Sequence, residues 1–413
     1  MKKNRIAIIG AGAVGLFAAA SVISDDYNQI TVFEKNSFTG KKLLITGKGR
    51  CNVTNNCDLQ EFMSNIPQNS KFLFSAMRKL STQDTIDFFV SLGVPLKTER
   101  GKRMFPESDK AADIRDALYK RAVENGTEFI FDTVKDVKES NCVFTVITKN
   151  SVYEFDRVII ATGGASYPRT GSTGDGYRFA KNFGHTVTPL YPSLVPLVCR
   201  EKYLSRIMGL SLKNVKLSIV DSANGKVLWS DLGEMLFTHF GISGPLVLTA
   251  SSYVRNINSF PDRFLASIDL KPALSFEELD KRILSDFTKY QNRDFVNALN
   301  DLLPSKLIPV VIERSGIPER TKVCVIKKED RQALVRLLKE FTLQIRSTRP
   351  IDEAIITSGG VKLSEIDPST MQSKLCDGLY FAGEILDIDA YTGGFNLQIA
   401  FSTAYTAINS AII

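Results

Sequence analysis

Three glycines near the start of the chain constrain its fold more than any other feature. Gly10, Gly12 and Gly15 have the spacing G-x-G-x-x-G, and they follow an apolar run, residues 6–9, that is typical of a strand. Residues 16–23 then have the composition of a helix. Strand, tight turn and helix in this order are the fingerprint of a dinucleotide-binding unit, in which a helix N-terminus faces a pyrophosphate. The sequence therefore predicts a nucleotide site here.

A carboxylate at a suitable sequence spacing after the glycine motif supports the same prediction. Glu34 follows a second predicted strand, residues 30–33. A carboxylate at this position accepts hydrogen bonds from ribose hydroxyls and repels a 2′-phosphate.

Residues 1–24 imitate a secretory signal peptide, but an apolar signal segment has no reason to space glycines in this way. No other apolar run is long enough to cross a membrane, so we expect no membrane span.

Two further segments favour FAD over NAD as the dinucleotide. Residues 379–384 predict a strand that ends in Gly383 and Glu384, and residues 393–398 open a helix. In flavoproteins with two dinucleotide folds, such a segment brings a carboxylate to the ribityl chain and a helix N-terminus to the flavin pyrimidine. The predicted strand at 158–161, followed by Thr162 and Gly163, is similar to the central flavoprotein strand.

The chain changes its pattern twice along its 413 residues, which suggests two or three domains. Strands alternate with helices up to about residue 190, as in an α/β layered sheet. A period of two follows, then charged helices that begin with a capping box at Ser275 and Glu278. We expect a discontinuous FAD-binding domain (1–190 and 351–413), a β domain on the substrate side (191–273 and 341–350) and a helical insertion (274–340).

Four longer motifs resemble one protein family over nearly the whole chain. They are residues 40–43 with 46–55, residues 162–168 with 170–174, residues 236–245 and residues 378–398. The chain is similar in them to the HI0933-like flavoproteins, also called BaiN-type NAD(P)/FAD-dependent oxidoreductases, which include bacterial aminoacetone oxidases. The resemblance implies an α/β fold, with a Rossmann-like FAD-binding domain, an inserted β-barrel-like domain and a helical insertion within that barrel. It does not identify a substrate.

The motifs together give a set of expected FAD contacts. Lys42, Lys48 and Arg50 are cations in a glycine-rich loop, suited to a pyrophosphate or to the edge of the flavin. The full set of expected contacts is Gly10, Gly12, Ala13, Val14, Gly15, Glu34, Lys35, Lys42, Gly49, Arg50, Cys51, Asn52, Val134, Ala161, Thr162, Gly163, Gly383, Glu384, Gly394, Phe395, Asn396, Leu397 and Gln398.

Few residues are candidates for acid–base chemistry. With two histidines in the chain we expect no metal site, and His185 follows a helix and is expected to be structural. His239 interrupts the β pattern beside glycines, where a titratable ring meets substrate, and Tyr167 follows the predicted flavin strand. Both are catalytic candidates, with packing as the alternative. Cys51 and Cys57 have a spacing unlike that of flavin dithiol enzymes, so buried thiols are expected.

Charge and cysteine content bear on partners and location. The chain has 52 Lys and Arg against 45 Asp and Glu, a net charge of +7 without a run of like charges. Such a spread does not indicate a nucleic-acid partner. Six cysteines are too few for a disulfide scaffold, so reduced thiols and a cytoplasmic location are expected. The oligomeric state stays open.

The function expected from these features is an FAD-dependent oxidoreductase for a small organic substrate. The reaction we expect first is the oxidation of an amine or amino-ketone by O2, as in the family's aminoacetone oxidases. One alternative is a reductase of a conjugated C=C bond, with NAD(P)H as a transient electron donor. Another is a flavin-dependent protein that modifies or binds RNA.

Overall fold

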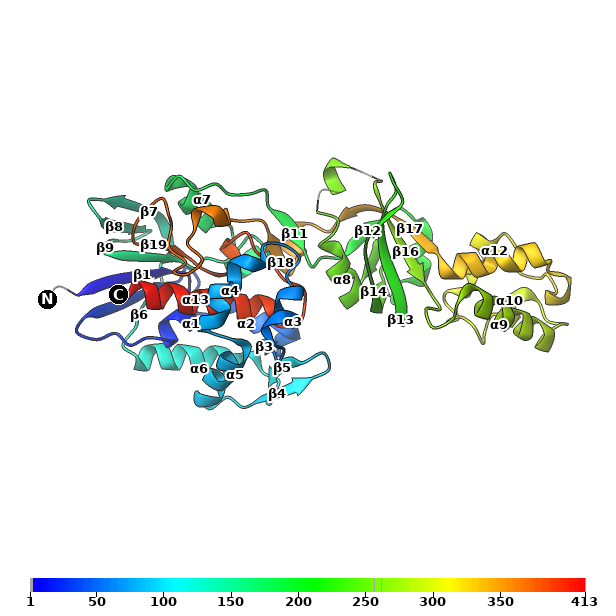
Figure 1. The fold of residues 1–413 in the computed structure, drawn as a ribbon, viewed down its shortest axis with the longest axis horizontal. Coiled ribbons are helices and arrows are strands. Elements are labelled where there is room, and N and C mark those ends of the chain that lie inside the picture. Colours follow the sequence, from blue (N-terminus) through cyan, green and yellow to red (C-terminus); the bar gives the residue numbers. More distant parts are fainter. Residues whose placement is uncertain (1–2, 256, 261, 413) are drawn as a thin grey trace. The chain divides into compact units, whose positions relative to one another are not determined.

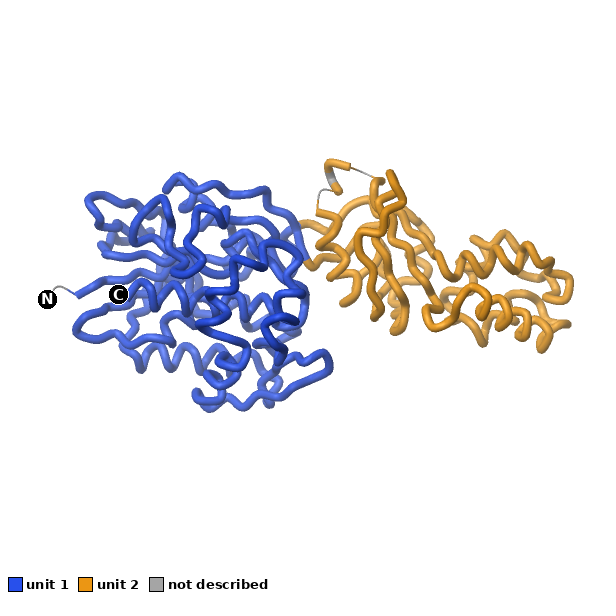
Figure 2. The backbone as a smooth tube through the Cα atoms, viewed as in Figure 1, with its two compact units in different colours: residues 1–193, 351–413 blue, residues 194–350 orange. Residues whose placement is uncertain are grey.

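The chain forms two compact units. The computed structural model describes residues 3–255, 257–260 and 262–412. Unit 1 comprises residues 1–193 and 351–413, and unit 2 comprises residues 194–350 (Figure 2). Unit 2 is therefore an insertion within the sequence of unit 1.

A five-stranded parallel sheet is the centre of unit 1 (Figure 1). Its strands, in spatial order, are β19 (Leu379–Phe381), β10 (Arg157–Ile160), β1 (Asn4–Ile9), β2 (Asn28–Phe33) and β6 (Glu128–Ile130). Its central strands are continuous apolar runs with buried side chains, as expected for a parallel sheet covered on both faces. Near it, α1 (Ala13–Ala20) packs on both α6 (Ala111–Glu124) and α13 (Phe395–Ala411). The predicted α/β fold with a Rossmann-like sheet is confirmed.

Smaller elements surround this sheet in unit 1. The antiparallel strands are β3 (Thr54–Asn55), β4 (Leu96–Glu99) and β5 (Arg103–Pro106) in one sheet, β7 (Val134–Ser140), β8 (Val143–Thr148) and β9 (Val152–Phe155) in a second, and β11 (Tyr191–Ser193) with β18 (Ile356–Ser358) in a third. The remaining helices are α2 (Lys41–Ile45), α3 (Leu59–Ser64), α4 (Phe74–Lys79), α5 (Thr82–Ser91) and α7 (Asp175–Asn182).

Unit 2 contains a closed six-stranded barrel. Its strands, in spatial order, are β12 (Leu197–Cys199), β15 (Gly241–Ser243), β14 (Lys226–Phe237), β13 (Ser211–Asp221), β16 (Phe264–Asp269) and β17 (Phe341–Thr348). In β13, Val215, Leu217 and Ile219 are buried while Lys216 is exposed, which is the period of two expected from the sequence. Closure of the barrel pairs the strand edges that an open sheet would expose.

The helices of unit 2 share one apolar core with this barrel. They are α8 (Pro245–Ser251), α9 (Phe276–Lys289), α10 (Phe295–Ala298), α11 (Ile308–Ser315) and α12 (Lys328–Lys339). The expected capping box opens α9, where Ser275 Oγ accepts from Glu278 N at 3.1 Å and Glu278 Oε2 accepts from Ser275 N at 2.8 Å. Leu279 and Ile283 of α9 lie in the same buried cluster as Phe341 of β17. None of the helices in the described ranges is long and apolar enough to span a membrane.

Candidate cofactor site

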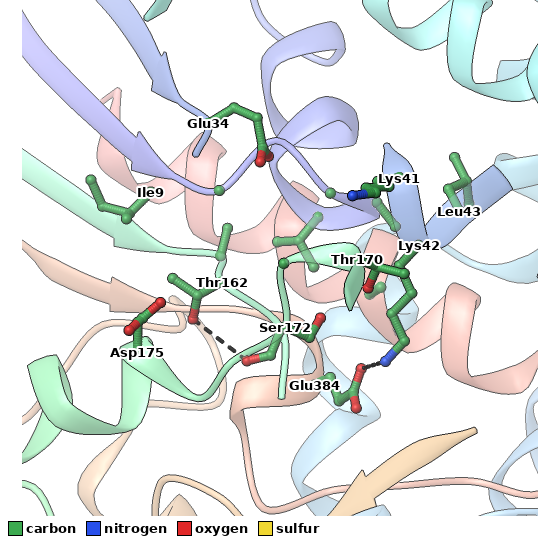
Figure 3. A pocket seen from close by; sticks show the side chains of 18 of the residues that line it. Ile9, Glu34, Lys41, Lys42, Leu43, Thr162, Thr170, Ser172, Asp175 and Glu384 are labelled. Carbon is green, nitrogen blue, oxygen red and sulfur yellow. Dashed lines mark hydrogen bonds and ion pairs between the residues drawn. The ribbon is translucent and has the colours of Figure 1, made fainter. Parts of the chain in front are cut away.

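A cavity in unit 1 lies at the carboxyl ends of β1, β2 and β10 (Figure 3). It holds about 1300 Å³ of space, including its open mouth. The carboxyl edge of a parallel sheet is where α/β proteins bind ligands. Fourteen of the residues expected to contact FAD line it: Gly10, Gly12, Ala13, Val14, Glu34, Lys35, Lys42, Val134, Ala161, Thr162, Gly163, Glu384, Asn396 and Leu397.

The glycine turn between β1 and α1 has the clearances that a dinucleotide requires. Gly10 has a φ of +109°, and a Cβ there would lie 2.6 Å from the carbonyl oxygen of Ala161. A Cβ on Gly15 would lie 1.9 Å from the carbonyl oxygen of Gly10, so α1 packs directly on the turn. At Gly12 a Cβ would meet no atom within 4 Å, which leaves open space beside the first turn of α1. The turn therefore fits a phosphate held by amide groups.

Glu34 is held at the end of β2 by three hydrogen bonds. Its Oε2 accepts from Ala11 N at 3.0 Å, and its Oε1 accepts from N and Nδ2 of Asn36 at 2.8 and 2.6 Å. The residue is buried but still lines the cavity. A fixed carboxylate at this place has the chemistry to accept from a ribose. The residues of unit 1 thus fit an adenosine diphosphate group.

The segment of residues 170–175 is hydrogen-bonded to Lys35 and Asn36, which follow β2. Lys35 Nζ lies 2.7 Å from Oδ2 of Asp175 and 2.5 Å from Oγ1 of Thr173. Asn36 Nδ2 also donates to the carbonyl oxygen of Thr170. Lys35 lines the cavity as expected, but its charge is balanced by Asp175.

A largely buried ion pair lies in the wall of the cavity (Figure 3), with side-chain exposures of 21% for Lys42 and 11% for Glu384. Lys42 Nζ of α2 donates to Glu384 Oε2 at 2.6 Å and to Ser166 Oγ at 2.7 Å. Glu384 Oε1 accepts from Ser166 Oγ at 2.8 Å and from Thr357 N at 2.9 Å. Burial by itself would raise the pKa of Glu384, but Lys42 and these hydrogen bonds outweigh burial and hold that pKa below its usual value. Glu384 is therefore ionised at neutral pH.

The C-terminal segment is fixed by residues that do not line the cavity. The backbone at Gly394 has a φ of +98°, and a Cβ there would lie 2.4 Å from the carbonyl oxygen of Thr54. Phe395 packs edge-on against Phe62, and Gln398 Oε1 accepts from Thr54 Oγ1 at 2.6 Å. These contacts anchor α13, and Asn396 and Leu397 of its first turn line the cavity. Gly383, in the turn after β19, is buried against Val14.

The glycine-rich loop after α2 was expected to contact the cofactor, but most of it lies outside the cavity lining. Gly49, Arg50, Cys51 and Asn52 are not among the cavity-lining residues, whereas Thr46 is. The Arg50 guanidinium pairs with Glu99 and Asp109, and it lies 4.2 Å from the centre of the Phe105 ring. Cys51 is buried, and burial raises the pKa of its thiol to about 12. Lys48 is exposed in a left-handed conformation, with a φ of +60°.

The two catalytic candidates lie in different units. Tyr167 is in unit 1, half-buried directly after Ser166, with its ring centre 5.9 Å from Lys42 Nζ. Its φ of +52° is a strained value for a bulky residue. His239 is in unit 2, exposed between β14 and β15. Within the described ranges, no group of three His, Cys, Asp or Glu side chains is placed to hold a metal ion.

Sequence reasoning did not single out two residues of the ion-pair network. Ser166 lies within the motif of residues 162–168 and 170–174, but no local pattern marks its side chain. Thr357 is buried in β18, and its Oγ1 accepts from the amides of Ala165 and Ser166 at 2.8 and 3.1 Å. No local pattern relates it to these partners, because about 190 positions separate them.

Comparisons with known proteins add a family to this geometry. The family model "HI0933-like protein Rossmann domain" matches residues 4–410. The chain is 32% identical over 411 residues to the 3-dehydro-bile acid delta(4,6)-reductase of Clostridium scindens, covering 99% of each chain. It is 33% identical over 406 residues to the ribosomal RNA dihydrouridine synthase of Haemophilus influenzae, covering 96% of each. The Escherichia coli ribosomal RNA dihydrouridine synthase is 30% identical over 413 residues, which is 100% of this chain and 99% of that protein.

A solved structure of lower similarity matches as well. The open conformation of a flavocytochrome c3 fumarate reductase is 16% identical, with a TM-score of 0.47, and covers 100% of this chain and 78% of that one.

Proposed function

This chain belongs to the HI0933-like family of flavoprotein oxidoreductases, and on that basis we propose that it is an FAD-dependent reductase of a C=C bond conjugated to a carbonyl group. One observation carries the proposal. The three relatives, each similar over at least 96% of both chains, are named for the reduction of a bile acid with 4,6 double bonds or for the formation of dihydrouridine. Both names imply addition of two hydrogens to a C=C bond. Amine oxidation by O2, which the sequence favoured first, has no such support.

The family implies FAD, and different residues of the cavity are proposed to bind different parts of it. When bound, FAD supplies hydride transfer. In this proposal the amide groups at Gly12 and Ala13 bind the pyrophosphate, and Glu34 binds the adenosine ribose; all three residues line the cavity. Lys42 provides a fixed cation in the wall of the same cavity, which Asn396 and Leu397 of α13 also line. NAD(P)H as the electron source is part of the proposal.

Reduction of a conjugated C=C bond also needs a proton donor. The hydride goes to one carbon, and a proton must reach the other. Tyr167 is our candidate donor, because it adjoins Lys42 of the cavity wall and is held in a strained backbone conformation, a feature that is frequent at functional sites. His239 stays the alternative donor.

Anaerobic stopped-flow experiments test the reaction. NADH or NADPH should reduce the bound flavin, and a conjugated ketone should reoxidise it faster than O2 does. Tyr167→Phe should leave the reductive step unchanged and slow reoxidation by the ketone about 10²- to 10⁴-fold, the usual contribution of a general acid. Flavin that is reduced by amines and reoxidised only by O2 would replace this proposal with the oxidase.

A uracil base in RNA is a second candidate substrate, and the distribution of charge favours it. Of the 52 basic and 45 acidic residues, 24 and 17 lie in unit 2, which leaves 28 of each in unit 1. The whole net charge of +7 therefore belongs to unit 2. Within the part of the chain that the structure describes, Lys213, Lys216 and Lys226 of the β13–β14 hairpin are exposed and make no ion pair. A concentrated positive charge favours a polyanion.

Binding of the full-length protein to ribosomal RNA tests this candidate. We expect an affinity that falls steeply between 50 and 200 mM salt, with a smaller slope after Lys213→Gln and Lys216→Gln. Lys97→Gln in unit 1, which removes a cation paired with Asp109, is the matched control and should keep the slope. Absence of salt-sensitive binding would leave a small conjugated ketone as the substrate class.

A further inference from the structure

We infer that Ser166 and Thr357 are positioning residues for the cofactor cavity. They hold the Lys42–Glu384 pair, and Thr357 connects that pair to the two-stranded ribbon of β11 and β18. This inference rests on flavin binding and on no particular substrate.

The ribbon lies at the two points where the chain passes between the units. Strand β11 precedes residue 194, the first of unit 2, and β18 follows soon after residue 350, the last. The strands pair antiparallel, with Pro192 opposite Thr357. Ser193 Oγ also donates to Asp389 Oδ2 at 2.8 Å. The ribbon is thus fixed within unit 1.

Thr357 connects three parts of unit 1, namely the ribbon, Glu384 and the segment that follows β10. Its backbone N–H donates to Glu384 Oε1, and its Oγ1 accepts from two successive amides after β10. The residue is fully buried, so each of these polar groups needs its partner. Loss of the hydroxyl would remove the acceptor of the part-buried amide of Ala165 and of the buried amide of Ser166.

Ser166 links the acid and the base of the pair. Its Oγ lies 2.7 Å from Lys42 Nζ and 2.8 Å from Glu384 Oε1, so it accepts from the ammonium and donates to the carboxylate. The packing around Gly164 is too tight for a side chain. A Cβ on Gly164 would lie 2.4 Å from Thr357 Oγ1 and 2.7 Å from Glu384 Oε1.

The network sets where the positive charge of Lys42 lies. An ammonium has three donors, and Glu384 and Ser166 take two of them. The third is available to a ligand in the cavity, whose wall Lys42 forms. A cation fixed beside a flavin favours the reduced form, which carries more negative charge. The position of Lys42 should therefore affect the flavin reduction potential, and Thr357 and Ser166 should act through it.

The experiment measures FAD affinity and the midpoint reduction potential of the full-length protein, without substrate. The variants are Lys42→Met, Thr357→Val, Thr357→Ser and Ser166→Ala. Thr188→Val is the matched control, because Thr188 Oγ1 accepts from Gly360 N at 3.0 Å, near the ribbon, but touches neither Glu384 nor Lys42.

We expect Lys42→Met to make the potential more negative. Thr357→Val and Ser166→Ala should shift it in the same direction by less, and Thr357→Val should weaken FAD binding about tenfold, because two amide groups lose their acceptor. Thr357→Ser keeps the hydroxyl that accepts from both amides, so it should resemble the wild type, as should Thr188→Val. If Thr357→Val does not fold, Ser166→Ala decides the test.

An unchanged potential in Ser166→Ala, or an equal shift in Thr188→Val, would overturn the inference. Because no substrate enters the experiment, such a result would leave the proposed reaction untouched. A wild-type protein that binds no FAD would instead contradict the cofactor itself.

Discussion

Lys42 Nζ lies 2.6 Å from Oε2 of Glu384, although 342 positions separate the two residues in the sequence. Each was expected to contact FAD on its own, the lysine through its charge and the glutamate through its carboxylate. The structure shows that they neutralise each other in the wall of the cavity. The pair has no net charge, but its two charges occupy separate fixed positions, so the cavity wall carries a fixed dipole with the Lys42 ammonium as its positive end.

Replacement of Glu34 tests the adenosine end of the site. Glu34→Ala removes a buried carboxylate that lines the cavity, and each charge-assisted hydrogen bond contributes roughly 1.5 to 3 kcal/mol. We expect the FAD dissociation constant to rise roughly tenfold to a hundredfold, measured by quenching of flavin fluorescence. Glu128→Ala, on the neighbouring strand β6 and outside the cavity lining, is the control. Equal FAD affinity in Glu34→Ala and wild type would contradict the assignment.

Glu384→Gln should destabilise the protein even without FAD. It leaves the ammonium of Lys42 in a mostly buried site without its counter-charge. We expect the free energy of unfolding of the apoprotein to fall by about 1.5 to 3 kcal/mol in urea titrations. Glu61→Gln breaks the exposed pair with Lys102 and should change it by about 1 kcal/mol or less. Similar losses in both variants would mean that burial of the pair has no special role.

His185 predicts a dependence of stability on pH. Its ring is buried between Glu365, 3.1 Å from Nδ1, and Ser373, 2.8 Å from Nε2. Burial lowers the pKa of His185 and outweighs the opposite effect of Glu365. The unfolded chain therefore binds a proton that the native state excludes as the pH falls below about 6.5, and native stability is lost in that range.

The matching experiment compares urea unfolding at several pH values. The unfolding free energy of the wild type should fall by at most about 1.4 kcal/mol per pH unit below pH 6.5, and His185→Gln should lack this part of the slope. His239→Gln, which changes an exposed ring, is the control. The same slope in wild type and His185→Gln would show that the titration belongs to other groups.

Deletion of the helical part of unit 2, about residues 274–340, should leave FAD bound. All residues that line the cavity belong to unit 1. The ends of the deletion can be joined by a short turn, because Ile268 of β16 is paired with Phe341 of β17. We expect a flavin spectrum like that of the wild type and altered reduction of the flavin by substrate.

Fluorescence of the single tryptophan, Trp229 in β14, reports whether the barrel survives this deletion. This control is needed because the helices share the apolar core of the barrel. Loss of FAD with an intact barrel would contradict the assignment of the cavity to unit 1 alone. Flavin reduction at the wild-type rate would show that the helices serve another purpose.

The parallel sheet and its glycine turn could be predicted from the sequence alone, and with them the place of a dinucleotide site. These features depend on local properties of the chain. The turn needs the left-handed conformation at Gly10 and the missing side chain at Gly15, and buried strands need uninterrupted apolar residues. Barrel strands and the capped helix α9 could be predicted for the same reason, since alternation and capping are read within a few residues.

Which charges are free depends on contacts between residues that are distant in the sequence. Arg50 looked like a phosphate ligand, but Glu99 and Asp109 neutralise it, and they lie 49 and 59 positions away. Thr357 became part of the cavity network because the ribbon returns the chain to unit 1 beside Ser166. The net charge seemed spread along the sequence until the fold assigned all of it to unit 2. Electrostatic partners act over a few ångströms in space, and a sequence states only separation along the chain.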